Sequence, residues 1–584
     1  MPNLPRVCSL LLCLTMPGAG WAQDTTPPAT DPVTTAPQRG PIDAGAFLAA
    51  RVAGKESDFV AGTTWFTRAL LSDPSNPELM EGAVVSAIGA GRVDNAVTMA
   101  NQSAPELRSI TAAIILLADE AKRADFEALL ANTKAGRQTA TLIDQLAVGW
   151  SELGAGRMSE AQAAFDKLSE TNGIGVFGTF HKALALASVG DFEGADAIFS
   201  GPEGASIKSL RRGVIAHAQI LSQLERNTDA IALLDEIFVP GQDAVIESLR
   251  TRLEAGEPVP FDVVRNAADG IAEVFFTLAT ALNGEADDTQ TLIYARIAAW
   301  LRPDHTEAQL LAAGLLDRLQ QPELATEAYA SIAPDDPAFV EAERGRADTM
   351  SRSGKTEAAI EVLTTLARTY PQMVDIHRQL GDLLRRDEKF EASIIAYDAA
   401  IALLGPVPGP RDWTLFYMRG IGHERQQRWD KASVDFRRAL DLQPDQPQVL
   451  NYMGYAMLER GEKLDEALSM IERAVAAEPE SGYIVDSLAW GYFQLGRYEE
   501  AVVPMEKASL LEPLDPVVTD HLGDVYWAVG RKLEAQFQWR RALSFEPEEK
   551  DANRIRRKLE TGLDAVLAEE GKDPIEAQTA ADGI

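Results

Sequence analysis

Apolar and small residues recur along most of this chain at the three- and four-residue spacing of amphipathic helices. From about Asp43 onward the helical pattern is organised in a unit close to 34 residues, in which bulky, small and Pro positions return in the same order. A Pro near the end of each unit stops one helix before the next unit begins. The pattern therefore predicts an all-α protein built from repeated pairs of antiparallel helices.

The last two units follow this period without a gap. The unit 482–515 has Leu488 in its first helix, Ala501 and Met505 in its second, and Pro513 near its end. The following unit, 516–549, has Leu522, Ala535, Trp539 and Pro547 at the same four positions. Small residues at fixed positions allow the helices of a pair to approach closely, so the spacing indicates structure as well as repetition.

Similar units continue upstream, with clear repeats over 272–549 and degenerate ones over 43–240. We expect about fourteen helix-turn-helix repeats, stacked as a right-handed α-solenoid. An insert at 241–271, rich in Pro and Gly at its start, interrupts the period and is a candidate boundary between two subdomains. At the C-terminus, the basic amphipathic stretch 550–569 predicts a capping helix, and 570–584 is expected to be a disordered tail.

The first 22 residues are typical of a secretory signal peptide: Arg6, an apolar run over 7–16, and small residues up to Ala22. A membrane anchor would need about 20 apolar residues, so cleavage after Ala22 is favoured. The Pro- and Thr-rich stretch 23–42 then predicts a flexible linker.

Both cysteines, Cys8 and Cys13, lie inside the predicted signal peptide, so the mature chain would carry no thiol. Neither follows a small residue as a lipobox cysteine does. We therefore expect a periplasmic protein without a lipid anchor and without a transmembrane segment in the mature chain.

Acidic residues outnumber basic ones by 88 to 55, a formal net charge of −33. Nucleic acid is therefore not expected as a partner, because phosphates are bound by Lys and Arg. An acidic surface of this kind is either an ordinary solvated surface or one that attracts a basic partner.

The sequence predicts no enzyme, metal site or cofactor site. Its six histidines fall in different units, and the HExxH-like phrase that begins at His423 has Gln427 where a second ligand would stand. No phosphate-binding loop, dinucleotide fingerprint or nucleophile elbow is found.

The stretch LAWGYFQLGRYEEAVVPMEKASLLEP, from Leu488 to Pro513, resembles a tetratricopeptide repeat. The closing stretch DHLGDVYWAVGRKLEAQFQWRRAL, from Asp520 to Leu543, is similar to the last repeat of exported tetratricopeptide proteins of Gram-negative bacteria. The resemblance implies a protein-interaction scaffold or adaptor of the cell envelope. Some of these proteins are lipoproteins that serve as adaptors for periplasmic carboxyl-terminal processing proteases. This chain lacks their lipobox, so their membrane anchoring does not carry over.

In such repeats the first helix of each unit lines the concave face of the stack, and in the last three units these positions alternate between aromatic and acidic residues. Exposed aromatics would anchor a partner, and the carboxylates would favour a basic or amide-rich segment. Alternatively, Trp490 and Trp527 only fill space between helices. The candidate partner-binding residues are Asn451, Tyr455, Tyr483, Asp486, Trp490, Phe493, Asp520, Asp524 and Trp527.

The resemblance favours an adaptor that presents this face to partner proteins, with a periplasmic protease and its substrates as one instance. The alternative is a structural bridge in envelope assembly or polysaccharide export.

Overall fold

The computed structural model describes residues 43–103, 108–137, 139–239, 243–572 and 575. The predicted signal peptide at 1–22, the linker at 23–42 and most of the predicted tail lie outside the described residues. Where the structure describes the chain, it consists of helices and turns without any strand. None of the helices described there is long and apolar enough to cross a membrane.

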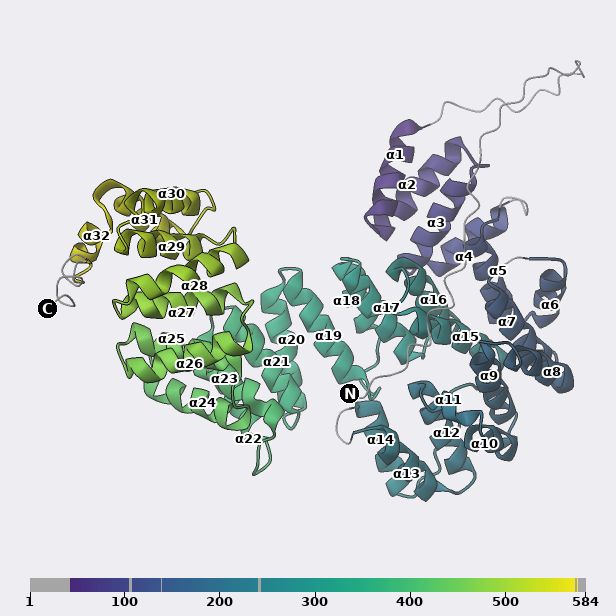
Figure 1. The fold of residues 1–584 in the computed structure, drawn as a ribbon. Coiled ribbons are helices and arrows are strands. Elements are labelled where there is room, and N and C mark those ends of the chain that lie inside the picture. Colours follow the sequence, from purple (N-terminus) through teal and green to yellow (C-terminus); the bar gives the residue numbers. More distant parts are fainter. Residues whose placement is uncertain (1–42, 104–107, 138, 240–242, 573–574, 576–584) are drawn as a thin grey trace, which may run out of the picture. The chain divides into compact units, whose positions relative to one another are not determined.

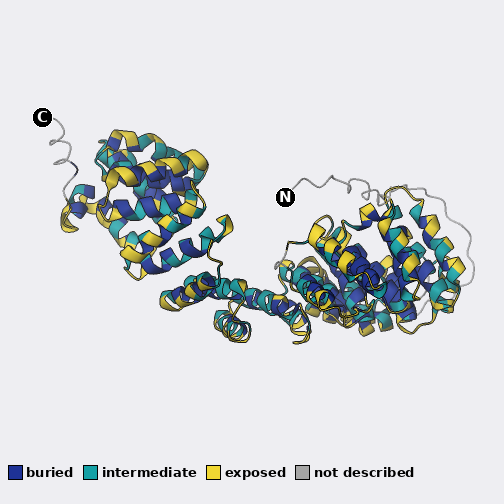
Figure 2. Cartoon of the chain, turned by 90° about the horizontal axis from the view of Figure 1, so that it is seen from below, coloured by how far each residue is buried: buried dark blue, intermediate teal, exposed yellow. Residues whose placement is uncertain are grey.

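The chain divides into two compact units, one up to Val362 and one from Leu363 onward. The division falls inside helix α20. Figure 2 shows that buried residues lie between the helices within each unit.

Among the described residues, fourteen helix-turn-helix pairs follow one another in chain order, which confirms the predicted all-α repeat fold (Figure 1). The pairs up to the division are α1 Ala44–Lys55 and α2 Phe59–Ser72, α3 Pro77–Gly89 and α4 Val93–Gln102, α5 Ile110–Lys122 and α6 Phe126–Lys134, α7 Thr141–Gly154 and α8 Met158–Ser169, α9 Gly175–Ser188 and α10 Phe192–Ser200, α12 Arg211–Gln223 and α13 Asn227–Ile237, α15 Ala267–Leu282 and α16 Asp288–Leu301, α17 Thr306–Arg318 and α18 Pro322–Ala330, and α19 Phe339–Arg352 and α20 Thr356–Thr369. The later pairs are α21 Val374–Arg386 and α22 Phe390–Ala402, α23 Trp413–Arg425 and α24 Trp429–Leu442, α25 Pro447–Glu459 and α26 Leu464–Ala477, α27 Gly482–Gln494 and α28 Tyr498–Leu511, and α29 Pro516–Ala528 and α30 Lys532–Leu543.

Small residues hold the helices of a pair close together. Gly523 of α29 lies against Trp539 of α30, so closely that a Cβ at this glycine would stand 2.4 Å from the indole ring. Ala535, one turn before Trp539 on the same helix, is completely buried. A left-handed residue, Gly530 with φ of 80°, makes the turn between the two helices. The sequence period therefore reflects close packing inside each pair.

The first unit departs from a simple stack, because α15 and α16 pack back against helices much earlier in the chain. Helix α15 contacts α5, α7 and α9, and α16 contacts α3, α4 and α5 (Figure 1). The physical reason is that α15, with the sequence AADGIAEVFFTLATAL, is apolar on nearly all sides and is buried along most of its length. A helix of this kind is stable only when other helices surround it.

The insert at 241–271 does not divide the chain into subdomains. Its helix α14, Ala244–Glu254, packs on α13, and its later residues already begin α15. Val259, Val263 and Val264 between these helices are buried. The insert is therefore an integral part of the first unit, and the predicted boundary there is wrong.

The predicted capping helix at 550–569 is two helices, α31 Glu549–Thr561 and α32 Leu563–Glu569. Gly562 between them has a φ of 88°, and a Cβ at this position would stand 2.7 Å from the ring of Trp527. Beyond α32, Ile575 is only 4% exposed and joins the same apolar cluster as Leu563 and Leu567. Ile575 is thus packed, although it falls in the stretch expected to be disordered.

Candidate protein-binding surface

The predicted partner-binding residues all lie on the first helices of three successive repeats, as the repeat period requires. Asn451 and Tyr455 lie on α25, Tyr483 to Phe493 lie on α27, and Asp520 to Trp527 lie on α29. Their exposure differs widely. Tyr483 is 57% exposed, Asn451 and Tyr455 are half-buried, and most of the others are buried.

Trp490 is packed between helices, as the alternative interpretation expects. It is only 8% exposed and stacks on Phe493 at 4.7 Å and on His521 at 3.9 Å between ring centroids. Its indole N–H points toward Oε1 of Glu459, at 3.4 Å. Trp490 therefore stabilises the α25–α27–α29 contact and is not an exposed anchor.

The acids of α29 are neutralised by the chain's own C-terminal helix. The ammonium group of Lys558 on α31 lies 2.7 Å from Oδ2 of Asp520 and 2.7 Å from each carboxylate oxygen of Asp524. The indole N–H of Trp539 also donates to Asp524, at 2.9 Å. Asp520 and Asp524 are therefore not free to attract a basic partner in this state.

Trp527 is likewise engaged by the C-terminal segment. Its indole N–H donates to Asp564 of α32 at 2.8 Å, and its ring lies 5.3 Å from that of Trp539. The other oxygen of Asp564 accepts the backbone N–H of Ile575 at 3.0 Å. Through these two hydrogen bonds, the Asp564 carboxylate holds α32 and Ile575 against the last repeat.

His521 and Asp486 form a second buried polar contact on this face. Nδ1 of His521 lies 3.0 Å from Oδ1 of Asp486. Burial disfavours the charged imidazole, but the carboxylates of Asp486, Asp520 and Asp524 together outweigh burial and raise the pKa of His521 above its ordinary value. For Asp520 burial has the larger effect. It raises the pKa of the carboxyl group, although the nearby Lys558 ammonium acts to lower that pKa.

The predicted face of the last two repeats is consequently covered by residues of the same chain. A cavity of only about 60 Å³ remains between Trp490, Phe493, Arg554 and Ile575. Sequence reasoning found the aromatic and acidic residues and predicted a capping helix at 550–569, but it did not predict that this segment would engage those same residues. The signal was present in Arg554 and Lys558, which stand four residues apart on one face of α31.

The part of the predicted face that remains accessible lies on α25 and at the start of α27. Tyr483 projects there, and the side chains of Asn451 and Tyr455 are half-buried. Among the described residues, the buried amide oxygen Oδ1 of Asn451 has no hydrogen-bond donor. A buried acceptor of this kind would be satisfied by a donor from a bound partner or by water.

A second surface, in the first unit, already holds an extended segment of the chain. The backbone N–H of Val259 donates to Oγ of Ser222 at 3.0 Å, and Nε2 of Gln223 donates to the carbonyl of Val259 at 2.6 Å. The backbone N–H of Asp262 donates to Oε1 of Gln219 at 3.0 Å. Helix α12 thus binds a polypeptide backbone through its polar side chains.

Arg302, at the end of α16, completes this arrangement by donating to the carbonyls of Asp262 and Val263 at 2.9 and 2.7 Å. Sequence reasoning described the segment as an insert and missed its binding. Pro258 and Pro260 were the available signal, since prolines favour an extended backbone. A cavity of about 440 Å³ lined by side chains of both charges, among them Arg211 and Glu307, lies beside the segment.

A buried polar cluster lies near this segment. Glu273 of α15 is fully buried, 3.2 Å from Nε of Arg212 and 3.4 Å from Nε2 of His305. Burial would raise the pKa of Glu273, but Arg212 and the two nearby histidines lower it to about 2. Burial lowers the pKa of His181 to about 4. The described residues contain no group of three or more His, Cys, Asp or Glu side chains that could hold a metal ion.

Comparisons with known proteins point to the same repeat. Residues 345–408 match the family model described as tetratricopeptide repeat. A TPR repeat-containing protein of Pseudomonas aeruginosa is 28% identical over 88 residues, and the match spans only 15% of either chain.

Among solved structures, a tetratricopeptide repeat protein of Parabacteroides merdae covers 44% of this chain at 17% identity, with 97% of its own chain aligned and a TM-score of 0.37. The Cut9–Hcn1 hetero-tetramer of the APC/C covers 89% of this chain at 12% identity, with 96% of its own chain aligned and a TM-score of 0.36. The tetratricopeptide repeat is thus matched by sequence in part of the chain, and helix-turn-helix pairs make up most of the described residues.

Proposed function

We propose that this protein is a non-enzymatic scaffold or adaptor of the bacterial cell envelope that binds segments of other proteins on its repeat helices. One observation carries the proposal. Side chains of α12, and Arg302 just after α16, bind the backbone of residues 259–263 through direct hydrogen bonds. Repeat helices of this chain can therefore hold an extended polypeptide.

The periplasm is the proposed location, supported by the signal-peptide pattern of residues 1–22. Partner proteins are proposed to approach the accessible residues Asn451, Tyr455 and Tyr483. A basic or amide-rich segment suits this surface, because the whole chain is strongly acidic. A periplasmic protease with its substrates is the proposed pair of partners, on the resemblance to exported tetratricopeptide proteins.

Site-specific crosslinking in living cells tests this proposal. A photo-crosslinking amino acid would replace Tyr483, and in a matched control it would replace Leu510, which is 81% exposed on the second helix α28 of the same repeat. We expect Tyr483 and not Leu510 to give discrete adducts, identified by mass spectrometry as a protease and its substrates.

Adducts with synthase or porin subunits would instead support the structural bridge in envelope assembly. Adducts that are equally frequent at both positions, or none at Tyr483, would contradict the proposed surface.

A further inference from the structure

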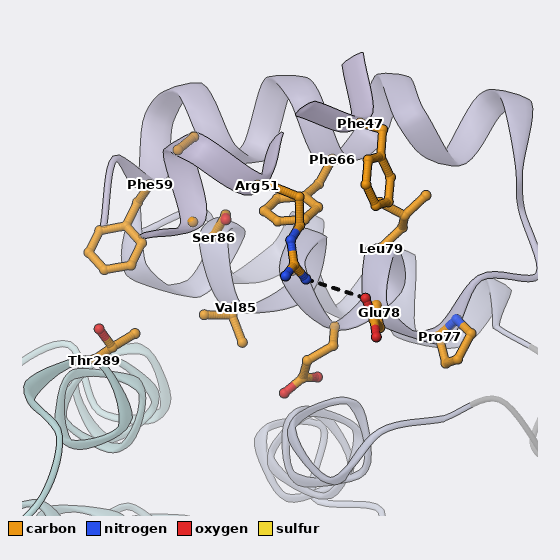
Figure 3. Close-up of a pocket in the computed structure, with 14 residues that line it drawn as sticks. Phe47, Arg51, Phe59, Phe66, Pro77, Glu78, Leu79, Val85, Ser86 and Thr289 are labelled. Atoms are coloured by element: carbon orange, nitrogen blue, oxygen red, sulfur yellow. Dashed lines mark hydrogen bonds and ion pairs between the residues drawn. The ribbon is translucent and has the colours of Figure 1, made fainter. Parts of the chain in front are cut away.

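A cavity of about 500 Å³ opens at the beginning of the first unit, between α1, α3 and α16 (Figure 3). Helix α16, far from α3 in sequence, packs back against α3 here. Its walls are mainly apolar and aromatic, and Thr289 of α16 closes one side. The volume lies within the range of about 300–1,000 Å³ that is usual for ligand pockets. The residues that give it its apolar character are Phe47, Phe59, Phe66, Leu79 and Val85.

Glycines shape the inner wall of this cavity. The ring of Phe66 lies directly on Gly82, where a Cβ would stand 2.3 Å from the ring. Gly54, at the end of α1, faces the same ring with more room, since a Cβ there would stand 3.4 Å away. Phe66 is therefore held in place from α3, while the cavity stays open on the side of Gly54.

The mouth of the cavity carries an excess of negative charge. Arg51 reaches Glu78 across it at 3.3 Å, and the two side chains are 61% and 73% exposed (Figure 3). An exposed ion pair of this kind is weak and can exchange partners. Glu81 lines the cavity as well, with its carboxylate hydrogen-bonded by Ser109 and by Thr111 at 2.7 Å, so the lining carries two carboxylates and one guanidinium. An anionic ligand such as a fatty acid is disfavoured at this mouth.

We propose that this cavity binds one large apolar side chain from an extended, positively charged segment of a partner protein. The aromatic walls receive the apolar side chain, and Glu78 exchanges Arg51 for a basic residue of the segment. This inference rests on the proposed function, since it assumes a protein partner, but it assigns a second surface in a different unit. It adds a Leu, Met or Phe flanked by Lys or Arg to the description of the partner.

Synthetic peptides test the proposal on the full mature chain. The probes are fluorescent nine-residue peptides in a Gly-Ser background with Ala, Leu, Met or Phe at the centre and either Lys or Glu on both sides, measured by anisotropy. We expect the Leu, Met and Phe peptides to bind at least tenfold more tightly than the Ala peptide. We expect Lys flanks to bind more tightly than Glu flanks.

Gly54→Leu is the blocking variant. Gly54 lines the cavity, and a Cβ there would stand 3.4 Å from Phe66, so we expect the leucine side chain to occupy the cavity. Leu also favours a helix more than Gly does, so the fold should be kept. The matched control is Gly314→Leu on α17, where a Cβ meets nothing within 4 Å. We expect at least a tenfold loss of affinity in the first variant and no loss in the second. Glu78→Lys should reverse the preference between Lys and Glu flanks.

Equal affinities of the Gly54→Leu and Gly314→Leu variants would overturn the site, as would Ala peptides that bind as tightly as Leu peptides. Binding of oleate that Gly54→Leu abolishes, without binding of any peptide, would assign the cavity to lipids instead. These failures are distinguishable from failure of the scaffold function, because the crosslinks from Tyr483 report on the other unit.

Discussion

Lys558 is the residue on which the last repeat depends most directly. Its side chain is fully buried, and its ammonium group forms ion pairs with Asp520 and Asp524. Removing one partner of a buried ion pair leaves an uncompensated charge, which typically costs about 3–5 kcal/mol. We expect Lys558→Met to lower the free energy of unfolding by about this amount, measured by urea denaturation.

The control for this prediction is Lys507→Met. Lys507 forms an exposed ion pair with Glu480 at 3.1 Å. Exposed pairs contribute about 0–1 kcal/mol, so this variant should unfold almost as the wild type does. Similar losses in the two variants would contradict a special role for the buried lysine.

His181 should make stability depend on pH. Burial lowers its pKa from 6.5 to about 4, so the folded protein keeps this ring neutral. In the unfolded chain the ring takes up a proton as pH falls below 6.5, and the unfolded state is thereby favoured. The contribution of His181 is therefore complete above pH 6.5 and is lost as pH falls toward 4, by roughly 1.4 kcal/mol per pH unit.

His181→Gln tests this dependence, because Gln cannot titrate but can still accept the indole N–H of Trp150, which now donates to Nδ1 of His181 at 3.0 Å. Denaturant unfolding between pH 7 and 4.5 should decline less steeply in this variant. Parallel pH profiles for the two proteins would refute the assignment.

The residues of the candidate surface show how far sequence can predict a site. The 34-residue period assigned Asp486, Trp490 and Asp524 to the first helices of their pairs, and the structure has them on α27 and α29. It could not predict their burial. That depends on Lys558 and Ile575, which lie outside the repeats and follow no period.

At the scale of elements, the stability of the first unit depends on close packing where α15 crosses α7. Gly270 lies on the indole ring of Trp150, where a Cβ would stand only 2.2 Å away. Gly270→Val should therefore force the helices apart and lower the free energy of unfolding by at least about 1–3 kcal/mol. The control is Gly314→Val, because a Cβ at Gly314 meets nothing within 4 Å. The stability of both variants is measured by thermal unfolding followed by circular dichroism. Equal stability of the two variants would show that the crossing adapts without cost.

The helical pairs could be predicted from sequence, whereas this crossing could not. Alternation of small and bulky residues, as in Gly523 and Trp539, specifies contacts within a pair and is local in sequence. The contact of α15 with α7 joins residues more than 100 positions apart, and only the uniformly apolar sequence of α15 hinted that it needs cover on every side. The binding of residues 259–263 to α12 escaped prediction for the same reason.

At the scale of the whole molecule, each unit uses its own chain to cover helical faces that a partner could otherwise bind. In the first unit α15 fills the space between α5, α7 and α9, and in the second α31 and α32 cover α29. The two surfaces proposed for partners lack such cover: the cavity at Phe66 in one unit, and Asn451 to Tyr483 in the other. A partner that reaches both units would contact two separate sites.

The net charge of −33 attracts a basic partner over a distance, before the two proteins touch. At about 0.01 M salt the Debye length is about 30 Å, so a basic peptide is attracted by much of the surface, whereas at 0.15 M it is about 8 Å and only nearby charges count. We expect the association rate of a Lys-flanked peptide to fall at least tenfold between these conditions while its dissociation rate changes little, because long-range attraction mainly affects encounter. Stopped-flow anisotropy measures both rates, and the same peptide with Ser in place of Lys is the control. If the two peptides respond equally to salt, the acidic surface plays no part in attracting partners and only the local chemistry of the two sites remains.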